Sequence, residues 1–318
     1  MPLLQIYILY AFTIFFTLIF AYLNLKKFKV YTFNKKKKIY LAGGFFIFLN
    51  LIIYLIFNKI FFHETNFFLI SLSICAFFLG LADDKFNLSP LLRIFTVAFL
   101  VLILLYNFSY YEVNFISLFN TIWVIKYPFS IFFTIICFLL ILNAMNFADG
   151  INCLAISIFI YAFGYIFINF SNNSILIFTI ITTLILLFYL NWKNFLYLGD
   201  SGVYLLSFLL SFIIIDTFKS NYEIFSAEKI FFLLYLPGID LVRLFFIRLY
   251  NKKSPFVGDQ MHIHHYLVRK IGSSKTLFIY LSFLIFPMIL VDFFLINKII
   301  VFLFSFIFYI ILLFYAKN

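Results

Sequence analysis

The densest group of reactive side chains lies late in the chain, in the stretch "GDQMHIHHYL". It holds one acid and three of the four histidines: Asp259, His262, His264 and His265. Such side chains bind metal ions, transfer protons or hydrogen-bond to phosphate. If the stretch were helical, Asp259, His262 and His265 would form one stripe and His264 would point elsewhere. A zinc site and a solvated loop are the alternatives, although no H-E-x-x-H helix or Cys pair supports zinc.

A pair of acids occupies the stretch "GLADDKFNLSPLLR". On a helix, Asp83 and Asp84 are about 100° apart, so they cannot both aim at one point. One could bind a metal ion while the other orients a substrate or accepts a proton. The alternative is a solvated helix end, followed by a new helix that begins at Pro90.

Polar side chains, three amides and one acid, recur every three residues in "NAMNFADGINCLA": Asn143, Asn146, Asp149 and Asn152. The Asp149-Gly150 pair predicts a turn. Turn chemistry alone does not explain two asparagines at the apolar end, where desolvated amides need partners. A nucleotide base is one candidate partner.

A third acid lies in "YLGDSGVYLLSF", where Gly199 and Gly202 flank Asp200 and Ser201 at a predicted helix start. Backbone N–H groups there could bind phosphate, and Asp200 could bind Mg²⁺. An ordinary Asp or Ser N-cap is the alternative.

The stretch that precedes the histidines begins with Pro237-Gly238, inside a long apolar segment. This pair should break the helix, which a membrane tolerates only where the break faces protein or a polar cavity. Asp240 and Arg243, with Arg248 as a further candidate, would then line that cavity.

The elements that must position these residues are membrane helices, because the chain is 66% hydrophobic and only 11% charged. The net charge of +11 does not indicate nucleic acid, since the lysines lie in short loops between apolar segments. Three cysteines give no disulfide framework. We predict an all-α helical bundle whose spans are 3–24, 40–58, 66–82, 91–107, 128–145, 151–170, 174–191, 201–218, 229–249, 277–296 and 298–315. The last two could form one bent element, which would give ten spans instead of eleven.

Loop charge sets the predicted orientation. All but five of the 23 Lys and Arg fall in alternate loops, beginning with the loop that carries Lys35–Lys38. These loops should be cytoplasmic, which places the N-terminus outside and the C-terminus inside. Six of the twelve acids and the three clustered histidines fall on the same side. A transporter would place polar groups near the bilayer midplane, so the rim position favours an enzyme with a cytosolic substrate.

Taken in order, "DD…P", "NxxNxxDG", "GDSG" and "SPF…D…HIHH" resemble the polyprenyl-phosphate N-acetylhexosamine-1-phosphate transferases of glycosyltransferase family 4. The match extends over residues 80–270 and is closer to the enzymes that initiate O-antigen or teichoic-acid synthesis than to the peptidoglycan translocase. The resemblance implies one transmembrane transferase domain over residues 1–318, including a cytoplasmic histidine loop at 250–276. It would transfer a sugar phosphate, GlcNAc-1-phosphate first, from a UDP-N-acetylhexosamine to polyprenyl (undecaprenyl) phosphate and release UMP.

The resemblance also implies roles for individual residues. The expected catalytic residues are Asp83, Asp84, Asp200, His264 and His265. The expected substrate-binding residues are Asn143, Asn146, Asp149, Asn152, Arg243, Asp259 and His262. The expected Mg²⁺ ligands, with Mn²⁺ as a substitute ion, are Asp200, Asp84 and Asn146. The chain departs from the family's "DGxDGLA" pattern, because Asn152 replaces an Asp and Cys153 replaces a Gly. Asn can still offer an acceptor and a donor.

The implied location is the bacterial cytoplasmic membrane, with the active site facing the cytoplasm and with a homodimer as one candidate assembly. Two rival functions stay open at this point. One is the phospho-N-acetylmuramoyl-pentapeptide transferase of peptidoglycan synthesis, and the other is a non-enzymatic transporter or flippase of lipid-linked sugars.

Overall fold

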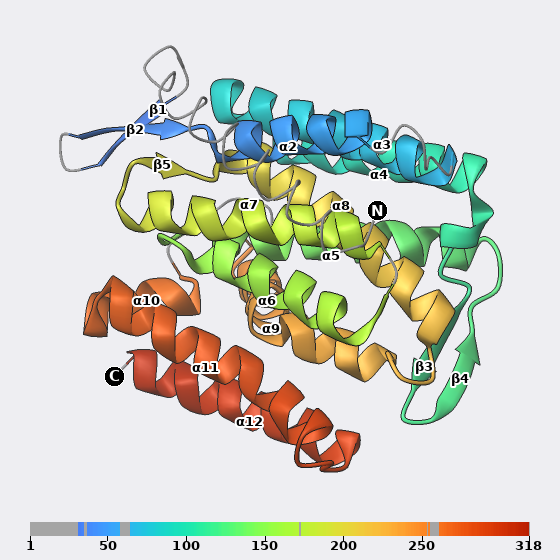
Figure 1. Cartoon of the computed structure of the whole chain (residues 1–318). Coiled ribbons are helices and arrows are strands. Elements are labelled where there is room, and N and C mark those ends of the chain that lie inside the picture. The colour runs from blue at the N-terminus through green and yellow to red at the C-terminus, as the bar shows by residue number, and fades with distance from the viewer. Residues whose placement is uncertain are drawn as a thin grey trace.

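The computed structural model describes residues 31–34, 37–57, 64–171, 173–252, 254 and 261–317. In this part of the chain, long helices run alongside one another in a bundle (Figure 1). The helices are α2 (Gly43–Phe57), α3 (Glu64–Phe86), α4 (Pro90–Asn107), α5 (Phe129–Ala148), α6 (Leu154–Asn169), α7 (Ser174–Trp192), α8 (Gly199–Asn221), α9 (Ala227–Tyr250), α10 (Ile263–Ile271), α11 (Ser273–Asp292) and α12 (Lys298–Lys317). A short 3-10 helix, η2 (Ser109–Tyr111), follows α4.

The helices confirm an all-α polytopic membrane protein. Among the described residues, eight helices are long and apolar enough to cross a membrane, and α2 and α6 are shorter apolar helices. Ten of the eleven predicted spans coincide with these helices, whereas the first, residues 3–24, lies outside the described residues. The alternative of one bent C-terminal element is wrong, because α11 ends at Asp292 and α12 begins at Lys298.

Helix α8 forms the centre of the bundle, since nearly all of its side chains are buried. Helices α2 and α3 pack closely against its first turn. Glycines permit this approach: a Cβ on Gly80 would collide with the carbonyl oxygen of Asp200, and one on Gly44 would collide with the nitrogen of Gly202. The start of α8 is thereby fixed by direct backbone contact.

Helix α9 is broken as predicted. Leu234 has non-helical dihedrals, φ −130° and ψ 17°, and Pro237 lies three residues further on. Proline cannot donate to the helix ladder, and its ring displaces the preceding turn. The kink therefore separates an outer half of α9 from the half that carries Asp240 and Arg243.

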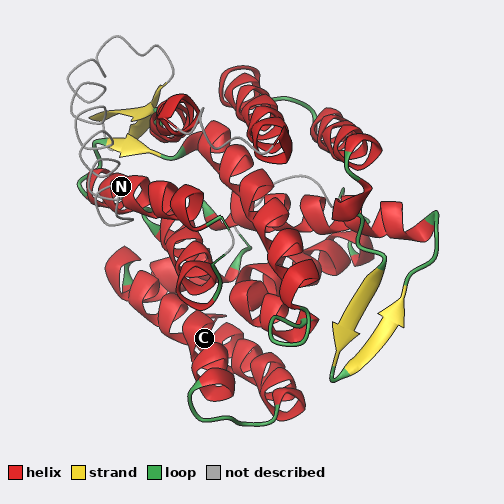
Figure 2. Cartoon of the chain, turned by 45° about the vertical axis from the view of Figure 1, so that its right-hand side comes forward, coloured by secondary structure: helices red, strands yellow, loops and turns green. Residues whose placement is uncertain are grey.

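Two small sheets were not anticipated from the sequence. In one, β2 (Lys37–Leu41) pairs antiparallel with β1 (Tyr31–Asn34) and parallel with β5 (Leu196–Tyr197), just before α8. In the other, β3 (Phe115–Leu118) and β4 (Thr121–Val124) form a hairpin. The two sheets lie at opposite ends of the bundle (Figures 1 and 2), and the first marks the end that holds the polar motifs.

Candidate active site

The two neighbouring acids of α3 point in different directions, as their helical spacing predicts. Asp83 is buried, and its Oδ1 accepts the Leu88 N–H at 2.8 Å. Its Oδ2 accepts from the Arg93 guanidinium at 3.0 Å and from the Tyr204 hydroxyl at 2.7 Å. Asp83 thus ties the α3–α4 turn to α8. It does not line the polar cavity described below, and a catalytic role for it stays a prediction.

Asp84 instead caps α8 from a neighbouring helix. Its Oδ1 accepts the Asp200 N–H at 2.9 Å, and its Oδ2 accepts the Ser201 N–H at 3.1 Å. Carboxylates stabilise helix N-termini because the first N–H groups have no partner within the helix. Gly199, with φ +73°, allows this contact, since a Cβ there would lie 2.9 Å from the Asp84 carboxylate.

This arrangement overturns two interpretations of the "GDSG" motif, the phosphate site and the N-cap. The expected phosphate cradle is wrong for the N–H groups of Asp200 and Ser201, because both donate to Asp84. The alternative, an N-cap by Asp200 or Ser201, is also wrong: the N-cap position is Leu198, and no side-chain capping bond forms within this segment. The Asp200 carboxylate is therefore not used as a cap.

Of the two asparagines on α5, one reaches α8 and one does not. The Asn146 amide donates to Asp200 Oδ1 at 2.8 Å. The Asn143 amide donates to Leu139 O, one turn earlier in its own helix, at 2.7 Å. Asn146 therefore orients the Asp200 carboxylate, whereas the substrate contact of Asn143 stays a prediction.

The Asp149-Gly150 turn closes α5, with Asp149 at the C-cap. Burial, followed by the nearby charges of Asp200 and Asp84, raises the pKa of the Asp149 carboxyl well above its usual range. Just beyond the turn, the Asn152 amide donates to Asn194 Oδ1 at 2.6 Å.

Cys153 occupies the position where the family pattern has glycine. Its φ of +66° is a left-handed conformation that glycine adopts without strain. The Asn191 side chain supports this turn, because its Oδ1 accepts the Cys153 N–H at 2.7 Å. The cysteine is therefore held in a backbone conformation that explains the usual glycine.

These segments enclose one polar cavity of about 330 Å³. The residues that line it include three acids, two asparagines and one tyrosine: Asp84, Asp149, Asp200, Asn152, Asn191 and Tyr197. Among the described lining residues none is cationic, so three acids share the cavity without a compensating Lys or Arg. The sequence motifs on α3, the α5–α6 turn and α8 therefore meet at one place.

Oxygen ligands of this kind suit Mg²⁺, which keeps several water molecules and often binds only one or two carboxylates together with substrate phosphates. No three described His, Cys, Asp or Glu side chains form a ready-made metal cage. The cavity thus fits an ion whose coordination is completed by water and phosphate. Asp200 is the best placed ligand, since only its Oδ1 is taken by Asn146.

The three histidines gather on the other side of the Asp149-Gly150 turn. His262 is the N-cap of α10, which begins at Ile263, so the helical condition on which a stripe of Asp259, His262 and His265 depended is not met at His262. The rings of His262 and His264 stack at 5.5 Å, and those of His264 and His265 lie 4.3 Å apart. His264 therefore belongs with the others; Asp259 lies outside the described residues.

Gly150 joins the histidine cluster to the acidic cavity. A Cβ on Gly150 would lie 2.6 Å from His264 Nε2 and 3.0 Å from the His265 ring. Burial, followed by the neighbouring His265 and His262, lowers the pKa of His264 to about 3. Near neutral pH His264 is therefore an uncharged hydrogen-bonding group rather than a cation.

The break in α9 places Asp240 and Arg243 beside the histidines. Asp240 Oδ2 lies 2.8 Å from His262 Nδ1, and Asp240 Oδ1 accepts from Arg243 Nη2 at 2.8 Å. Arg243 also donates to the Met261 carbonyl at 2.7 Å. Arg243 thus holds the start of the histidine segment, and its predicted substrate contact stays a prediction.

Several residues at the site were not predicted from the sequence: Arg93, Asn191, Asn194, Tyr197, Tyr204 and Tyr309. Asn191 was the easiest of these to predict, because an amide at the end of an apolar helix needs a hydrogen-bond partner. In the structure this amide is buried. The tyrosines gave no such indication, since the chain contains 22 of them.

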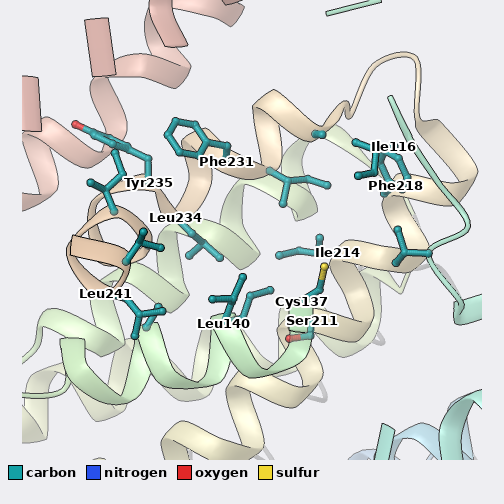
Figure 3. A pocket seen from close by; sticks show the side chains of 18 of the residues that line it. Ile116, Cys137, Leu140, Ser211, Ile214, Phe218, Phe231, Leu234, Tyr235 and Leu241 are labelled. Atoms are coloured by element: carbon teal, nitrogen blue, oxygen red, sulfur yellow. The ribbon is translucent and has the colours of Figure 1, made fainter. Parts of the chain in front are cut away.

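A second, apolar cavity of about 580 Å³ lies between α5, α8 and the kinked α9 (Figure 3). Leu140, Ile214, Leu234 and Leu241 point into it. At the end nearer the polar motifs its lining includes Ala144, two residues before Asn146, and Arg243. This apolar cavity thus reaches the end of α5 that carries Asn146, the residue bonded to Asp200.

Comparisons with known proteins agree with this picture. The sequence model described as "Glycosyl transferase family 4" matches residues 66–218, which include every acid of the polar cavity. A Thermotoga maritima protein is 32% identical over 247 residues, covering 76% of this chain and 72% of that protein. Proteins of Escherichia coli K12 and Salmonella typhi are 25% and 24% identical over 215 residues, covering 64% of this chain. All three are named undecaprenyl-phosphate alpha-N-acetylglucosaminyl 1-phosphate transferase, and the match spans 59% of the length of the latter two.

Proposed function

The chain belongs to glycosyl transferase family 4, and on that footing we propose that it transfers N-acetylglucosamine-1-phosphate from UDP-N-acetylglucosamine to undecaprenyl phosphate. The products would be undecaprenyl-diphospho-N-acetylglucosamine and UMP. The observation that carries the proposal is the single polar cavity in which Asp84, Asp149 and Asp200 meet, next to the histidine cluster and close to an apolar cavity. We place this centre at the cytoplasmic face of a bacterial inner membrane, because the loops at this end carry most of the basic residues.

The polar cavity is the proposed binding site of the UDP-sugar donor. Tyr197 has a ring on which a nucleotide base could stack, and Asn152 could hydrogen-bond to the edge of the base. Both polar atoms of Asn191 are already bonded, to the Cys153 N–H and to the Leu196 carbonyl. A nucleotide diphosphate is anionic, however, and three carboxylates would repel it. The described cavity lining supplies no cation, so the donor is expected to bind together with a divalent metal ion.

Asp200 is the proposed principal Mg²⁺ ligand, and Asp84 and Asn146 orient it through the α8 N-terminus and through Asp200 Oδ1. When bound, the ion would neutralise charge on the diphosphate and on the departing UMP. Mn²⁺ has similar oxygen-ligand preferences and could replace it.

The apolar cavity is the proposed binding site of the prenyl chain of the lipid acceptor. Its lining is almost entirely hydrocarbon, and it lies between helices that are apolar enough to cross a membrane. A prenyl chain in this cavity would have its phosphate near Arg243, which is part of the lining, and near Asn146, two residues after the lining residue Ala144.

In the transfer, an oxygen of the lipid phosphate bonds to the β-phosphorus of the UDP-sugar. The bond from that phosphorus to the bridging oxygen breaks, and UMP leaves with the electron pair. A phosphate monoester has its second pKa near 6, so the attacking oxygen is already ionised near neutral pH. Both Asp84 oxygens accept backbone N–H groups, which supports a positioning role rather than that of a general base.

The histidine cluster would act on the diphosphate or the sugar across Gly150. His264, neutral near pH 7, can hydrogen-bond to a phosphate oxygen without adding charge. His265 contacts the same glycine and is the second group placed to reach the donor.

Purified protein in nanodiscs with undecaprenyl phosphate and Mg²⁺ would test the proposal. We expect UMP release with UDP-N-acetylglucosamine, and slower or no release with UDP-N-acetylgalactosamine or the UDP-muramoyl-pentapeptide. Preference for the pentapeptide would indicate the peptidoglycan enzyme instead. A lipid-linked sugar that crosses the bilayer, with no UMP from any donor, would indicate a flippase and overturn the proposal.

A further inference from the structure

The Asp240 carboxylate lies beside the histidine cluster and contacts its first member, His262. Asp240 is buried, and its two oxygens serve different partners. Oδ2 lies 2.8 Å from His262 Nδ1 and 3.3 Å from the backbone nitrogen of Ile263. Oδ1 accepts from Arg243 and from the hydroxyl of Tyr309, the latter at 2.7 Å. Asp240 therefore connects α9, the start of α10 and α12.

The Asp240 contact determines how His262 presents its ring. An ionised carboxylate accepts hydrogen bonds only, so the His262 nitrogen that faces it, Nδ1, carries a proton. The other nitrogen, Nε2, is buried and has no hydrogen-bond partner among the described residues. The ring lies between Phe147, at 4.6 Å, and His264, which contacts Gly150. His262 Nε2 is thus the free end of a supported imidazole, one ring away from the Asp149-Gly150 turn.

Tyr309 is the member of this group that comes from outside the site. It lies on α12, which contributes no residue to the acidic cavity. Its hydroxyl donates to Asp240 Oδ1, and it accepts from Arg243 Nε at 2.7 Å. One hydroxyl therefore fixes both the carboxylate and the arginine that pairs with it. Without this hydroxyl, Asp240 Oδ1 would keep only its bonds from Arg243, and the carboxylate would be held less firmly against His262 Nδ1.

We propose that Tyr309 is a positioning residue for the transfer reaction: through Asp240 it fixes the tautomer and orientation of His262, whose Nε2 then serves the reacting diphosphate. The inference rests on the proposed function, since the step that His262 serves is the sugar-phosphate transfer. Tyr309 is not among the residues that line either cavity, so its effect on turnover passes through its two hydrogen-bond partners, Asp240, which pairs with His262, and Arg243.

The kinetic test is Tyr309→Phe, which removes the hydroxyl and keeps the ring. We expect kcat to fall about tenfold, with less than a twofold change in KM for UDP-N-acetylglucosamine. Tyr165→Phe is the matched control, because Tyr165 also donates to an aspartate at 2.7 Å, Asp292, away from both cavities. This control should retain the wild-type kcat. A Tyr309→Phe enzyme within twofold of wild type would overturn the proposal.

A double-mutant cycle separates positioning from general weakening of the fold. In a His262→Gln background, Tyr309→Phe should lower kcat by less than twofold further, because its route to the reaction is already lost. An undiminished tenfold loss in that background would show that Tyr309 acts elsewhere, and would also overturn the proposal.

A spectroscopic measurement keeps the proposal testable even if the wild-type protein releases no UMP. The chain has only four histidines, so ¹⁵N-histidine labelling gives a readable imidazole spectrum, in which His262→Gln assigns the His262 signals. We expect a single Nδ1–H tautomer in wild type and in Tyr165→Phe, and a mixture in Tyr309→Phe. An unchanged single tautomer in Tyr309→Phe would contradict the positioning role, whatever the activity.

Discussion

The acidic cavity and the histidine cluster face each other across Gly150, and their electrostatics are opposite. In the cavity, Asp84, Asp149 and Asp200 share one space with no cation among the described lining residues. In the cluster, Asp240, its one acid among the described residues, receives hydrogen bonds from an arginine and a tyrosine and pairs with a histidine. The described acids of the first region thus lack a positive partner in the cavity lining, whereas the acid of the second region has one in Arg243. This contrast is what the proposed binding of a divalent ion in the cavity predicts.

The largest expected effect comes from neutralising an acid in the cavity. Asp200→Asn should lower turnover by about a hundredfold, or ~2.7 kcal/mol of barrier, because it removes the charge of the proposed principal metal ligand. The same substitution relieves repulsion among three carboxylates, so the Tm without added metal should stay equal or rise. Steady-state UMP release and thermal unfolding in detergent measure the two quantities. A large drop in Tm would show that Asp200 is a structural partner and would remove the contrast.

Neutralising the acid in the histidine cluster should act mainly on the fold. Asp240→Asn leaves the partly buried Arg243 without its carboxylate and should destabilise the protein by about 2–3 kcal/mol. We expect a clear fall in Tm with or without Mg²⁺, as seen by the same thermal unfolding. If Asp240→Asn and Asp200→Asn changed Tm alike, the two regions would not differ in the way described.

A histidine that contacts the turn should affect turnover more than stability. His265→Ala should lower kcat at least about tenfold, or ~1.4 kcal/mol of barrier, because it removes a group placed beside Gly150. Tm should move less than in Asp240→Asn, since His265 is only partly buried. Wild-type turnover in His265→Ala would exclude this side chain from the reaction.

The smallest effect concerns pH. The pKa of His264 is about 3 in the folded protein and near 6.5 in an unfolded chain, so the unfolded state binds the extra proton first. His264 therefore leaves stability intact above pH 6.5 and costs stability progressively as the pH falls from 6.5 towards 3. Between pH 7.5 and 5.5 this amounts to about 1 kcal/mol. His264→Gln should show a correspondingly flatter dependence of Tm on pH, and an identical dependence would mean that His264 is not buried as a neutral ring.

The membrane helices could be predicted because long apolar segments have one stable arrangement in a bilayer, and ten of the predicted spans coincide with helices. The kink of α9 was predictable for the same local reason, the presence of Pro237. The sheets were not, because β2 pairs with a two-residue strand more than 150 positions later. Pairing over such a distance leaves no periodic signal in a short segment.

The site shows the same division between local and distant causes. The divergence of Asp83 and Asp84 followed from helical geometry. The cap that Asp84 places on α8 did not, because its partners lie 116 and 117 residues away and an N-cap is normally sought next to its helix. Tyr309 lies 69 residues from Asp240 in an apolar helix, where nothing distinguishes it from its neighbours. The order of the motifs predicted which segments lie together, and only the fold shows what each side chain contacts.

The most direct test of the proposed reaction follows the β-phosphorus of the donor. Nanodisc-bound protein with Mg²⁺, undecaprenyl phosphate and UDP-N-acetylglucosamine labelled with ³²P at the β-position should transfer the label to the lipid fraction. One unlabelled UMP should form for each labelled lipid. Label that stays in a soluble nucleotide while the sugar reaches the lipid would indicate glycosyl transfer, and would contradict the sugar-phosphate transfer on which the account depends.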